Sequence, residues 1–319
     1  MSLRAAILDD YQAVALAAAD WASLKPAVEV TAFHDTLADS AQVAARLADF
    51  EIVVAMRERT PFPQALLARL PKLKLLITTG KRNAAIDVKA AAAQGVVVSG
   101  TDMLPYPTAE LAWGLILSLV RNIPREERGM RAGGWQTTLG VGLRGKTLGV
   151  LGLGNLGSQV ARIGKAFGME AIAWSQNLTA ERAASVGAAL VTKEELFRRA
   201  DVVSIHLVLS ERTRGLVGTA ELALMKSTAY LVNTSRGPIV DGKALLAALE
   251  NRRLAGAGLD VYDSEPLPRE HALRKLDNVV LTPHLGYVTA ENYRQAYGHA
   301  VEDIRAFLDG KPLRVLSAG

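Results

Sequence analysis

The sequence contains no cysteine, which excludes disulfide bonds, thiolate catalysis and metal sites with cysteine ligands. This absence agrees with a cytoplasmic protein, which is the location we expect. The longest apolar run, LAWGLILSLV at residues 111–120, is half the roughly 20 residues that a helix needs to cross a bilayer. We therefore expect the run to form a buried helix, and we expect no membrane partner.

We also expect no signal peptide, because the opening MSLRAAILDD has one basic residue and its short apolar run ends at Asp9 and Asp10. We interpret this opening as a first strand. Blocks of like charge are absent too: the formal net charge is +5, but basic and acidic residues alternate, as in RNIPREERGMR. Nucleic-acid binding is therefore not expected, whereas a mildly basic surface suits small anionic ligands. Because the chain stops at Gly319, we expect no appended regulatory domain.

Half of the 319 residues are apolar, and short β-branched runs alternate with helical patterns along almost the whole chain. The sequence contains no internal repeat of 20 to 50 residues. Nearly continuous apolar strands that alternate with helices predict an α/β fold with parallel sheets covered on both faces. We expect strands at 5–8, 51–55, 74–78, 146–152, 201–207, 229–233 and 257–261, and helices at 40–50, 156–168 and 241–251.

Two breaks divide the pattern. Pro105 and Pro107 interrupt it in SGTDMLPYPTAE, and a second break follows TPHLGY, after which a helix at about 289–309 would return the chain to the first domain. The sequence thus predicts two Rossmann-like, doubly wound parallel-sheet domains with a cleft between them. The predicted domains are residues 1–103 plus 288–319, which we expect to be flavodoxin-like, and residues 104–287, a Rossmann domain.

The segment KTLGVLGLGNLGSQVARIGKAFG contains a G-x-G-x-x-G motif that ends an apolar strand and opens an amphipathic helix. An ordinary glycine-rich turn can share this spacing, but strand, motif and helix together favour a dinucleotide-binding turn. Gly152 would permit the tight turn, Gly154 would let a pyrophosphate approach, and Gly157 would bring the helix close to the strand. Asn155 and Leu156 open the helix, whose free N–H groups suit phosphates.

The acidic residue that usually follows the first glycine by about 20 residues at an NAD site is missing. Ser175, Gln176 and Asn177 stand in its place. These neutral side chains can hydrogen-bond to a ribose and do not repel a 2′-phosphate. No arginine stands beside them in the sequence, and Arg182 is a turn or two away. The cofactor is therefore NAD(H) or NADP(H), with the preference open.

Six motifs follow one another along the chain: TAELAWGLILSLVR, LGLGNLG, DVVSIHLVLSERTRGLVG, MKSTAYLVNTSRGPIVD, GAGLDVYDSEPL and TPHLGY. In this order they resemble the D-isomer-specific 2-hydroxyacid dehydrogenases, the family of glyoxylate/hydroxypyruvate reductases and phosphoglycerate dehydrogenase. The resemblance covers nearly the whole chain and is strongest from about Thr108 to Gly286. It implies that the first domain binds substrate, that the second binds NAD(P), and that the protein interconverts a 2-keto acid and a D-2-hydroxy acid.

By resemblance the catalytic residues are Arg236, Glu265 and His284. Each alone could be a surface arginine, a solvated carboxylate or a loop histidine, but their joint occurrence in the family's order favours catalysis. An arginine fork can hold the carboxylate of a 2-keto acid and polarise its carbonyl. A protonated histidine can neutralise the carbonyl oxygen as hydride arrives, an effect worth roughly 100- to 10,000-fold in rate. A carboxylate on the other ring nitrogen fixes the tautomer.

The resemblance implies further contacts. The loop ITTGKRNAAID corresponds to a backbone nest for the substrate carboxylate, centred on Thr79, Gly80 and Lys81. We expect the other histidines, His34, His271 and His299, to be structural or solvated. Besides the glycine turn, the expected cofactor-binding residues are Thr108, Ser175, Gln176, His206, Thr234 and Asp260.

Two departures from the family pattern concern the substrate. Lys81 and Arg82 replace an apolar or small pair. They are either a solvated basic loop, which we slightly prefer, or an extra positive charge for a substrate with a second acidic group. Tyr287 stands where glycine is common and could narrow the substrate pocket or supply a hydroxyl.

Other functions are compatible with this fold. A dinucleotide-sensing, corepressor-like scaffold would need exposed peptide-binding or long tail segments, which we do not find. Formate dehydrogenation needs no Glu–His relay, so Glu265 argues against it. Related enzymes commonly dimerise through the cofactor domain, and the run at 111–120 with the arm IPREERGMRAGGW would suit a homodimer. We expect a small-molecule substrate and no metal.

Overall fold

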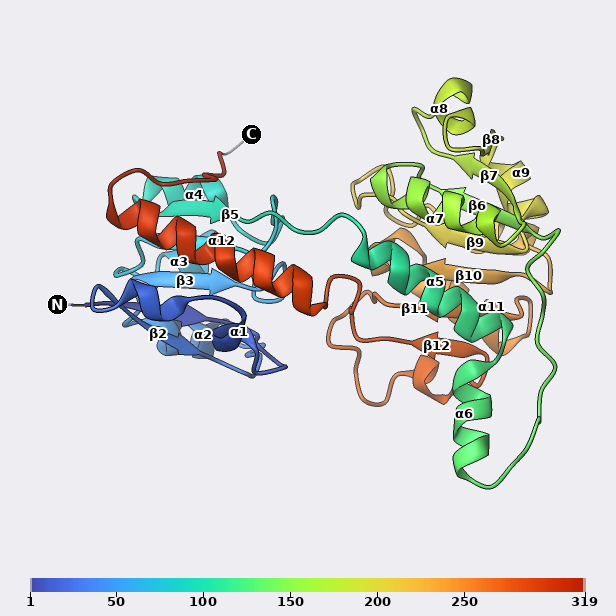
Figure 1. Cartoon of the computed structure of the whole chain (residues 1–319), viewed down its shortest axis with the longest axis horizontal. Helices are drawn as coiled ribbons and strands as arrows, with labels where there is room; N and C mark the ends of the chain where they lie inside the picture. Colours follow the sequence, from blue (N-terminus) through green and yellow to red (C-terminus); the bar gives the residue numbers. More distant parts are fainter. Residues whose placement is uncertain (1, 318–319) are drawn as a thin grey trace. The chain divides into compact units, whose positions relative to one another are not determined.

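The computed structural model describes residues 2–317, which fold into two compact units (Figure 1). Unit 1 runs to Leu104 and resumes at Val288, whereas unit 2 spans Pro105–Tyr287. The sequence placed these divisions after residues 103 and 287. Each unit is built on a parallel sheet with helices, so the predicted α/β fold class is confirmed.

Unit 1 has a parallel sheet in the order β2-β1-β3-β4-β5, which is the flavodoxin order. Its central strands read IVVA and LLIT and are buried along their whole length, as expected for strands that are covered on both faces. The strands are β1 (Leu3–Ile7), β2 (Val28–Ala32), β3 (Ile52–Ala55), β4 (Leu75–Thr78) and β5 (Val97–Gly100). The helices are α1 (Ala15–Ala18), η1 (Trp21–Leu24), α2 (Ser40–Leu47), α3 (Gln64–Leu67), α4 (Val88–Ala93) and α12 (Ala290–Leu308).

Unit 2 has a parallel sheet in the order β12-β11-β10-β9-β6-β7-β8, the Rossmann order extended by one strand at the β12 edge. The strands are β6 (Thr147–Leu151), β7 (Glu170–Trp174), β8 (Ala189–Leu190), β9 (Val202–Ile205), β10 (Tyr230–Asn233), β11 (Gly256–Leu259) and β12 (Val279–Leu281). The helices are α5 (Pro107–Val120), α6 (Ile123–Arg131), α7 (Asn155–Ala166), α8 (Ala180–Ala184), α9 (Lys193–Arg199), α10 (Thr219–Leu224), η2 (Gly237–Ile239), α11 (Gly242–Glu250) and η3 (Ala272–Lys275).

Two apolar clusters form the core of unit 2, one on each face of its sheet. Helices α5 and α7 pack in one cluster, and α9, α10 and α11 pack in the other. The apolar run at residues 111–120 lies in α5, where Leu115 and Ile116 are buried, so its prediction as a buried helix is confirmed. None of the helices within residues 2–317 is long and apolar enough to cross a membrane.

The predicted elements lie where expected, but their ends shift. The strand predicted at 146–152 ends at Leu151 because Gly152, at φ +101°, already turns the chain. The strand predicted at 201–207 ends at Ile205. In unit 2 the strand order reverses between β6 and β9, and ligands of doubly wound sheets bind beyond the carboxyl ends of the strands at such a point.

Candidate active site

The glycine turn after β6 has the close contacts that its motif predicts. A Cβ atom on Gly152 would lie 2.6 Å from the His206 carbonyl oxygen, and one on Gly157 would lie 2.0 Å from the Gly152 carbonyl oxygen. Only glycine fits at these two positions. By contrast, Gly154 is exposed, and a Cβ atom there would meet nothing within 4 Å. The space over Gly154 is therefore open, as the approach of a pyrophosphate requires.

Helix α7 begins immediately after Gly154, which serves as its N-cap. No side chain among the described residues caps this N-terminus, so the first N–H groups of the helix, including those of Asn155 and Leu156, are available to a ligand. The N-terminus of a helix favours anions through these groups and through its dipole. The turn and the helix together fit the pyrophosphate of a dinucleotide.

The loop after β7 carries Ser175, which is half-buried, and the exposed Gln176 and Asn177. None of these three residues is acidic. Arg182, which the sequence places a turn or two away, donates from Nη2 to Ser158 Oγ on α7 over 3.2 Å. This contact joins residues 24 positions apart, so no local sequence pattern indicates it.

Two buried polar atoms lie beyond the carboxyl ends of β9 and β10, on His206 and Thr234, and the His206 backbone packs against Gly152. His206 Nε2 lies 2.8 Å from Ser204 Oγ, but its Nδ1 has no hydrogen-bond partner among the described residues. Burial lowers the pKa of His206 to about 4, so the ring is neutral at neutral pH. Thr234 Oγ1 is also buried without a partner in the described chain. Unsatisfied buried groups are rare in proteins, and a bound cofactor would give these two atoms partners.

His284 and Glu265 form a close pair in unit 2. His284 Nδ1 lies 2.5 Å from Glu265 Oε2, and the other carboxylate oxygen accepts the Tyr262 backbone N–H over 2.9 Å. The imidazole side chain is 21% exposed. One edge of the ring is therefore fixed by a carboxylate, and Nε2 is left for exchange with a ligand.

Asp260, directly after β11, holds the loop that carries His284. Its carboxylate is fully buried and accepts hydrogen bonds from the Thr282 hydroxyl (2.6 Å) and from the backbone N–H groups of Leu285 (2.7 Å) and Gly286 (2.8 Å). Burial raises the pKa of Asp260, although these hydrogen bonds oppose the shift. His284 has a left-handed φ of +56°, which is uncommon outside glycine. The hydrogen bonds of Asp260 therefore hold an unfavourable backbone conformation at the histidine.

Thr108 closes the same loop from α5. Its hydroxyl donates to the Gly286 carbonyl oxygen over 2.8 Å. Thr108 and Asp260 were both predicted to bind the cofactor; in the structure each contacts the histidine loop, and direct cofactor contact stays a prediction for both.

Arg236 lies at the carboxyl end of β10, next to the strand that precedes Glu265. Its Nη1 donates to the Ser235 carbonyl oxygen over 2.8 Å, and its own carbonyl accepts from Asn233 Nδ2 over 3.0 Å. Gly237 packs so closely on the next loop that an added Cβ would lie 2.1 Å from the Tyr262 carbonyl carbon. The three predicted catalytic residues thus come from the ends of β10, β11 and β12, which are neighbours in the sheet.

Two tyrosines flank this group. Tyr287 is buried, and its ring packs edge to face against the His284 ring with 5.6 Å between centroids. Tyr262, which the sequence analysis did not single out, donates its hydroxyl to the carbonyl oxygens of Leu259 (3.0 Å) and Thr282 (2.9 Å). Burial raises the pKa of Tyr262, so the phenol stays a donor. The feature of the sequence that could have indicated Tyr262 is its position inside the motif LDVYDSEP.

The predicted substrate loop lies in unit 1, after β4. The Thr79 N–H donates to Ala55 O and the Gly80 N–H to Thr101 Oγ1, each over 3.0 Å, so of the three predicted residues Lys81 is left as the backbone donor for a nest. Its ammonium group pairs with Asp102 at 2.9 Å. This pairing offsets the charge of Lys81 and favours the solvated-loop interpretation over a second anion site.

Arg57 is a further residue at this loop that sequence reasoning missed. It follows β3 with a left-handed φ of +51°, and its backbone is held by Thr79 Oγ1 and Asn83 Nδ2. A Cβ atom on Gly80 would lie 2.5 Å from Arg57 Nη1, so the guanidinium lies against the loop. The only feature that could have indicated Arg57 is its position after β3, one of the two strands between which the strand order of unit 1 reverses.

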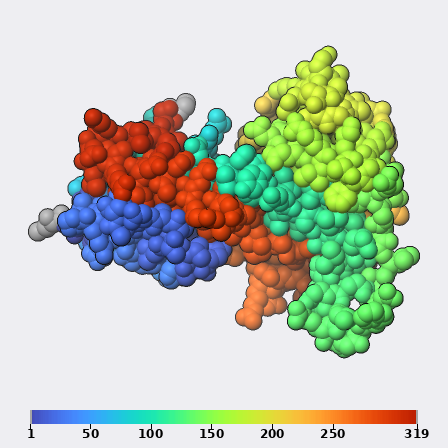
Figure 2. All heavy atoms as spheres, in the orientation of Figure 1, coloured from blue at the N-terminus to red at the C-terminus, as the bar shows by residue number. Residues whose placement is uncertain are grey.

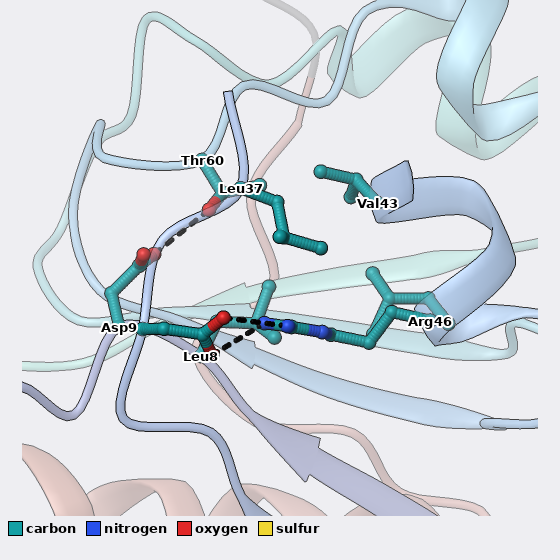
Figure 3. Close-up of a pocket in the computed structure, with 8 residues that line it drawn as sticks. Leu8, Asp9, Leu37, Val43, Arg46 and Thr60 are labelled. Carbon is teal, nitrogen blue, oxygen red and sulfur yellow. Dashed lines mark hydrogen bonds and ion pairs between the residues drawn. The ribbon is translucent and has the colours of Figure 1, made fainter. Parts of the chain in front are cut away.

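Unit 1 also contains a small cavity beyond the carboxyl end of β1 (Figure 3). Asp9 accepts hydrogen bonds there from the hydroxyls of Thr60 (2.8 Å) and Thr36, and Asp35 pairs with Arg46 at 2.7 Å. Its polar side chains thus satisfy one another, and the remaining lining is apolar. We assign no chemistry to it.

Comparisons with known proteins find a matching family, similar sequences and similar solved structures. The family described as "D-isomer specific 2-hydroxyacid dehydrogenase, NAD binding domain" matches residues 113–286. A glyoxylate reductase of Aeropyrum pernix is 43% identical over 256 residues, which cover 77% of this chain and 76% of that protein. A D-3-phosphoglycerate dehydrogenase of Methanocaldococcus jannaschii is 39% identical over 81% of this chain, which spans only 50% of that relative. The crystal structure of a phosphoglycerate oxidoreductase from Vibrio cholerae superposes with a TM-score of 0.92 at 38% identity, covering 97% of this chain and 99% of that one.

Proposed function

The chain belongs to the D-isomer-specific 2-hydroxyacid dehydrogenase family, and from this premise we propose that it reduces a small 2-keto acid to the D-2-hydroxy acid. It is an NAD(P)-dependent oxidoreductase that acts on a CH–OH group. Similar proteins are named for glyoxylate and for 3-phosphoglycerate, so we take a short 2-keto acid as the substrate. A cytoplasmic location stays a prediction.

In this proposal three residues bind the substrate, transfer the proton and orient the histidine. Bound NADH or NADPH supplies the hydride. Arg236 holds the substrate carboxylate and polarises the carbonyl through its guanidinium fork. His284 delivers the proton from Nε2 to the carbonyl oxygen as negative charge develops there. Glu265 fixes the ring through Nδ1 and stabilises its positive charge.

The observation that carries the proposal is the 2.5 Å contact between His284 Nδ1 and Glu265 Oε2. A general acid needs one ring nitrogen oriented by a partner and the other free for the substrate, and this pair has both properties. Formate dehydrogenation would not require such a pair. The scaffold interpretation is not favoured, because the similar proteins are named as enzymes.

The test is a small grid of purified protein with NADH or NADPH against glyoxylate, hydroxypyruvate, pyruvate, phenylpyruvate and oxaloacetate. Loss of reduced-nicotinamide absorbance is followed, and the product is assayed for the D configuration. We expect turnover with at least one short keto acid. Arg236→Lys serves as the diagnostic variant: it keeps the charge but loses the fork, so kcat/KM should fall about 10- to 100-fold. No turnover in any combination, with cofactor binding intact, would contradict the proposal.

We also propose a homodimer formed through an extended arm of unit 2, residues 123–142, which comprises the segment IPREERGMRAGGW and the loop after it. Helix α6 and the loop after it stand out from the rest of unit 2 (Figure 2). Large apolar side chains on this arm are exposed, among them Trp135 at 74% and Leu139 at 94%. Exposed apolar patches of this kind commonly mark protein interfaces. Light scattering at micromolar concentration should give twice the chain mass of 34.0 kDa, and Leu139→Arg should shift it toward the monomer. A monomeric wild-type protein would contradict this proposal.

A further inference from the structure

The loop between β7 and α8 lies at the place where a Rossmann site distinguishes its two cofactors. In such sites an acidic residue after the second strand of the order binds the ribose hydroxyls of NAD, whereas a nearby arginine accommodates the 2′-phosphate of NADP. β7 is that second strand, because it pairs with β6 on the side away from β9. Its loop offers Ser175, Gln176 and Asn177, which carry no negative charge.

Arg182 reaches back from α8 to the cofactor-binding helix. Its backbone N–H donates to the Thr179 side chain over 3.2 Å, which fixes the start of α8. Its guanidinium donates over 3.2 Å to Ser158 Oγ, one residue after Gly157 of the glycine turn. Ser158 Oγ in turn donates to the Leu153 carbonyl oxygen inside that turn over 3.3 Å. The guanidinium therefore links α8 to Ser158 of α7, the residue directly after the glycine turn.

The charge of Arg182 is not neutralised by an ion pair. Its side-chain partner is a neutral hydroxyl, and no salt bridge involves it within residues 2–317. The adjacent acid, Glu181, is engaged at its own helix N-terminus, where hydrogen bonds from its backbone N–H and the Thr179 side chain lower its pKa. Arg182 itself is exposed, so its remaining N–H groups are accessible to a ligand.

We propose that Arg182, with Ser175 and Gln176, binds the 2′-phosphate of NADP(H), and that the protein prefers NADP(H) to NAD(H). The inference rests on the proposed function, because it takes the glycine turn as the dinucleotide site. A guanidinium fork and neutral hydrogen-bonding side chains match a phosphate dianion, whereas a ribose hydroxyl gains nothing from the positive charge. Arg182 is thus a specificity-determining residue.

The test measures binding without turnover. The full chain is titrated with NADPH and with NADH in an isothermal calorimeter, in one buffer and without substrate. NADPH should bind about 10- to 100-fold more tightly, which is the worth of one or two hydrogen bonds to a charged group. Arg182→Met should remove this advantage and leave the NADH affinity unchanged. Adenosine 2′,5′-bisphosphate against AMP, titrated in the same way, isolates the phosphate from the nicotinamide half.

Three further variants make the result specific. Arg182→Lys keeps the charge and should retain part of the preference for NADPH. Ser175→Asp introduces the acid of an NAD site and should reverse the preference. Arg253→Met is the matched control: Arg253 is also an exposed arginine of unit 2, but it precedes β11 and so lies at the opposite edge of the sheet. It should change neither affinity.

Two results would overturn this inference alone: wild-type protein that binds NADH as tightly as NADPH, or an Arg182→Met variant that weakens both cofactors equally. The second would mean that Arg182 only braces α8 against α7. Absence of binding by either dinucleotide would overturn the inference together with the proposed function. The two proposals therefore fail in distinguishable ways.

Discussion

Each unit has a buried aspartate beyond the carboxyl end of a parallel strand, Asp9 after β1 and Asp260 after β11, but the two accept hydrogen bonds from different donors. Asp9 accepts from the hydroxyls of Thr36 and Thr60. Asp260 accepts from one hydroxyl and from the backbone N–H groups of Leu285 and Gly286. Burial raises the pKa of both carboxyl groups.

We expect this difference in donors to distinguish a structural aspartate from one that supports the proposed active site. A hydroxyl can rotate and can either donate or accept, so Asp9 fixes only side chains. A backbone N–H cannot be reversed, so Asp260 fixes the chain path on which His284 sits at φ +56°. Asp9 has a left-handed φ of its own, +59°, so backbone strain does not distinguish the two sites; the backbone N–H donors on the loop of His284 do.

The two units can also be compared through His34 and His284, each of which lies near an acidic residue. His34 in unit 1 also lies near an acid, with Nδ1 3.0 Å from the Asp10 carbonyl oxygen and 3.4 Å from its carboxylate. Its side chain is 55% exposed, whereas that of His284 is 21% exposed and packs against Tyr287. We therefore do not expect every histidine near a carboxylate to be catalytic. Position at the neighbouring ends of β10, β11 and β12 distinguishes the pair in unit 2.

The largest expected effect comes from removing each histidine in turn. His284→Asn should lower kcat by roughly 100- to 10,000-fold, the usual worth of a positioned general acid. His34→Asn should leave kcat within about twofold, because that side chain belongs to unit 1 and is mostly solvated. Steady-state rates at saturating keto acid and NADPH check both. Comparable losses in the two variants would remove the distinction between the pairs.

A second comparison exchanges the two buried aspartates for asparagine. Asp260→Asn must set an amide nitrogen against backbone donors, so we expect it to cost about 1–3 kcal/mol of unfolding free energy. We also expect at least a tenfold loss of kcat, because the His284 loop shifts. Asp9→Asn should cost less, since the threonine hydroxyls can turn to accept from the amide. Urea unfolding and steady-state kinetics test the pair, and equal costs would refute the argument from donor type.

The pH dependence of stability should have opposite signs in the two units. In unit 1, burial raises the pKa of Asp303 on α12 to about 7, although Arg314 opposes the shift. Between about pH 4 and pH 7 the folded chain keeps this proton and the unfolded chain releases it, so this contribution to stability falls as pH rises. In unit 2, burial lowers the pKa of His206 to about 4, so its contribution rises between about pH 4 and pH 6.5.

Denaturant unfolding between pH 4.5 and pH 7.5 tests these slopes in single variants. The stability of wild type relative to Asp303→Asn should fall with rising pH, and that relative to His206→Asn should rise, each by about 1 kcal/mol per pH unit or less. If the unfolding free energies of wild type and a variant change with pH in the same way, the substituted group does not titrate in the pH range that we predict for it.

The smallest effect concerns surface charge. The pair of Lys81 with Asp102 in unit 1 is exposed, with 77% of the lysine side chain accessible, so Lys81→Ala should cost less than about 1 kcal/mol. The pair of Lys193 with Glu221 in unit 2 is more enclosed, because the two side chains are only 24% and 15% exposed, so Lys193→Ala should cost more unfolding free energy.

Lys81→Ala should also lower kcat/KM equally for keto acids with and without a second acidic group. A selective loss for the diacid would instead support an extra anion site at Lys81.

The sequence alone determined the fold class, and it predicted the residues of the proposed site. Local patterns carry this information: strand and helix periods, the glycine spacing, and short motifs around Arg236, Glu265 and His284. The glycines at 152 and 157 were predictable because the contacts that exclude a Cβ atom involve the same turn and the strand beside it.

Only the tertiary structure decided how these residues are held. The contact between His284 and Glu265 joins residues 19 positions apart, that between Thr108 and Gly286 spans 178, and that between Arg182 and Ser158 spans 24. Such contacts depend on strand order and on the direction of each side chain at a sheet edge, which no local pattern encodes. The sequence therefore predicted the reacting groups, and the packing of the strand ends decided that Asp260 holds the loop of His284 and that Arg182 contacts α7.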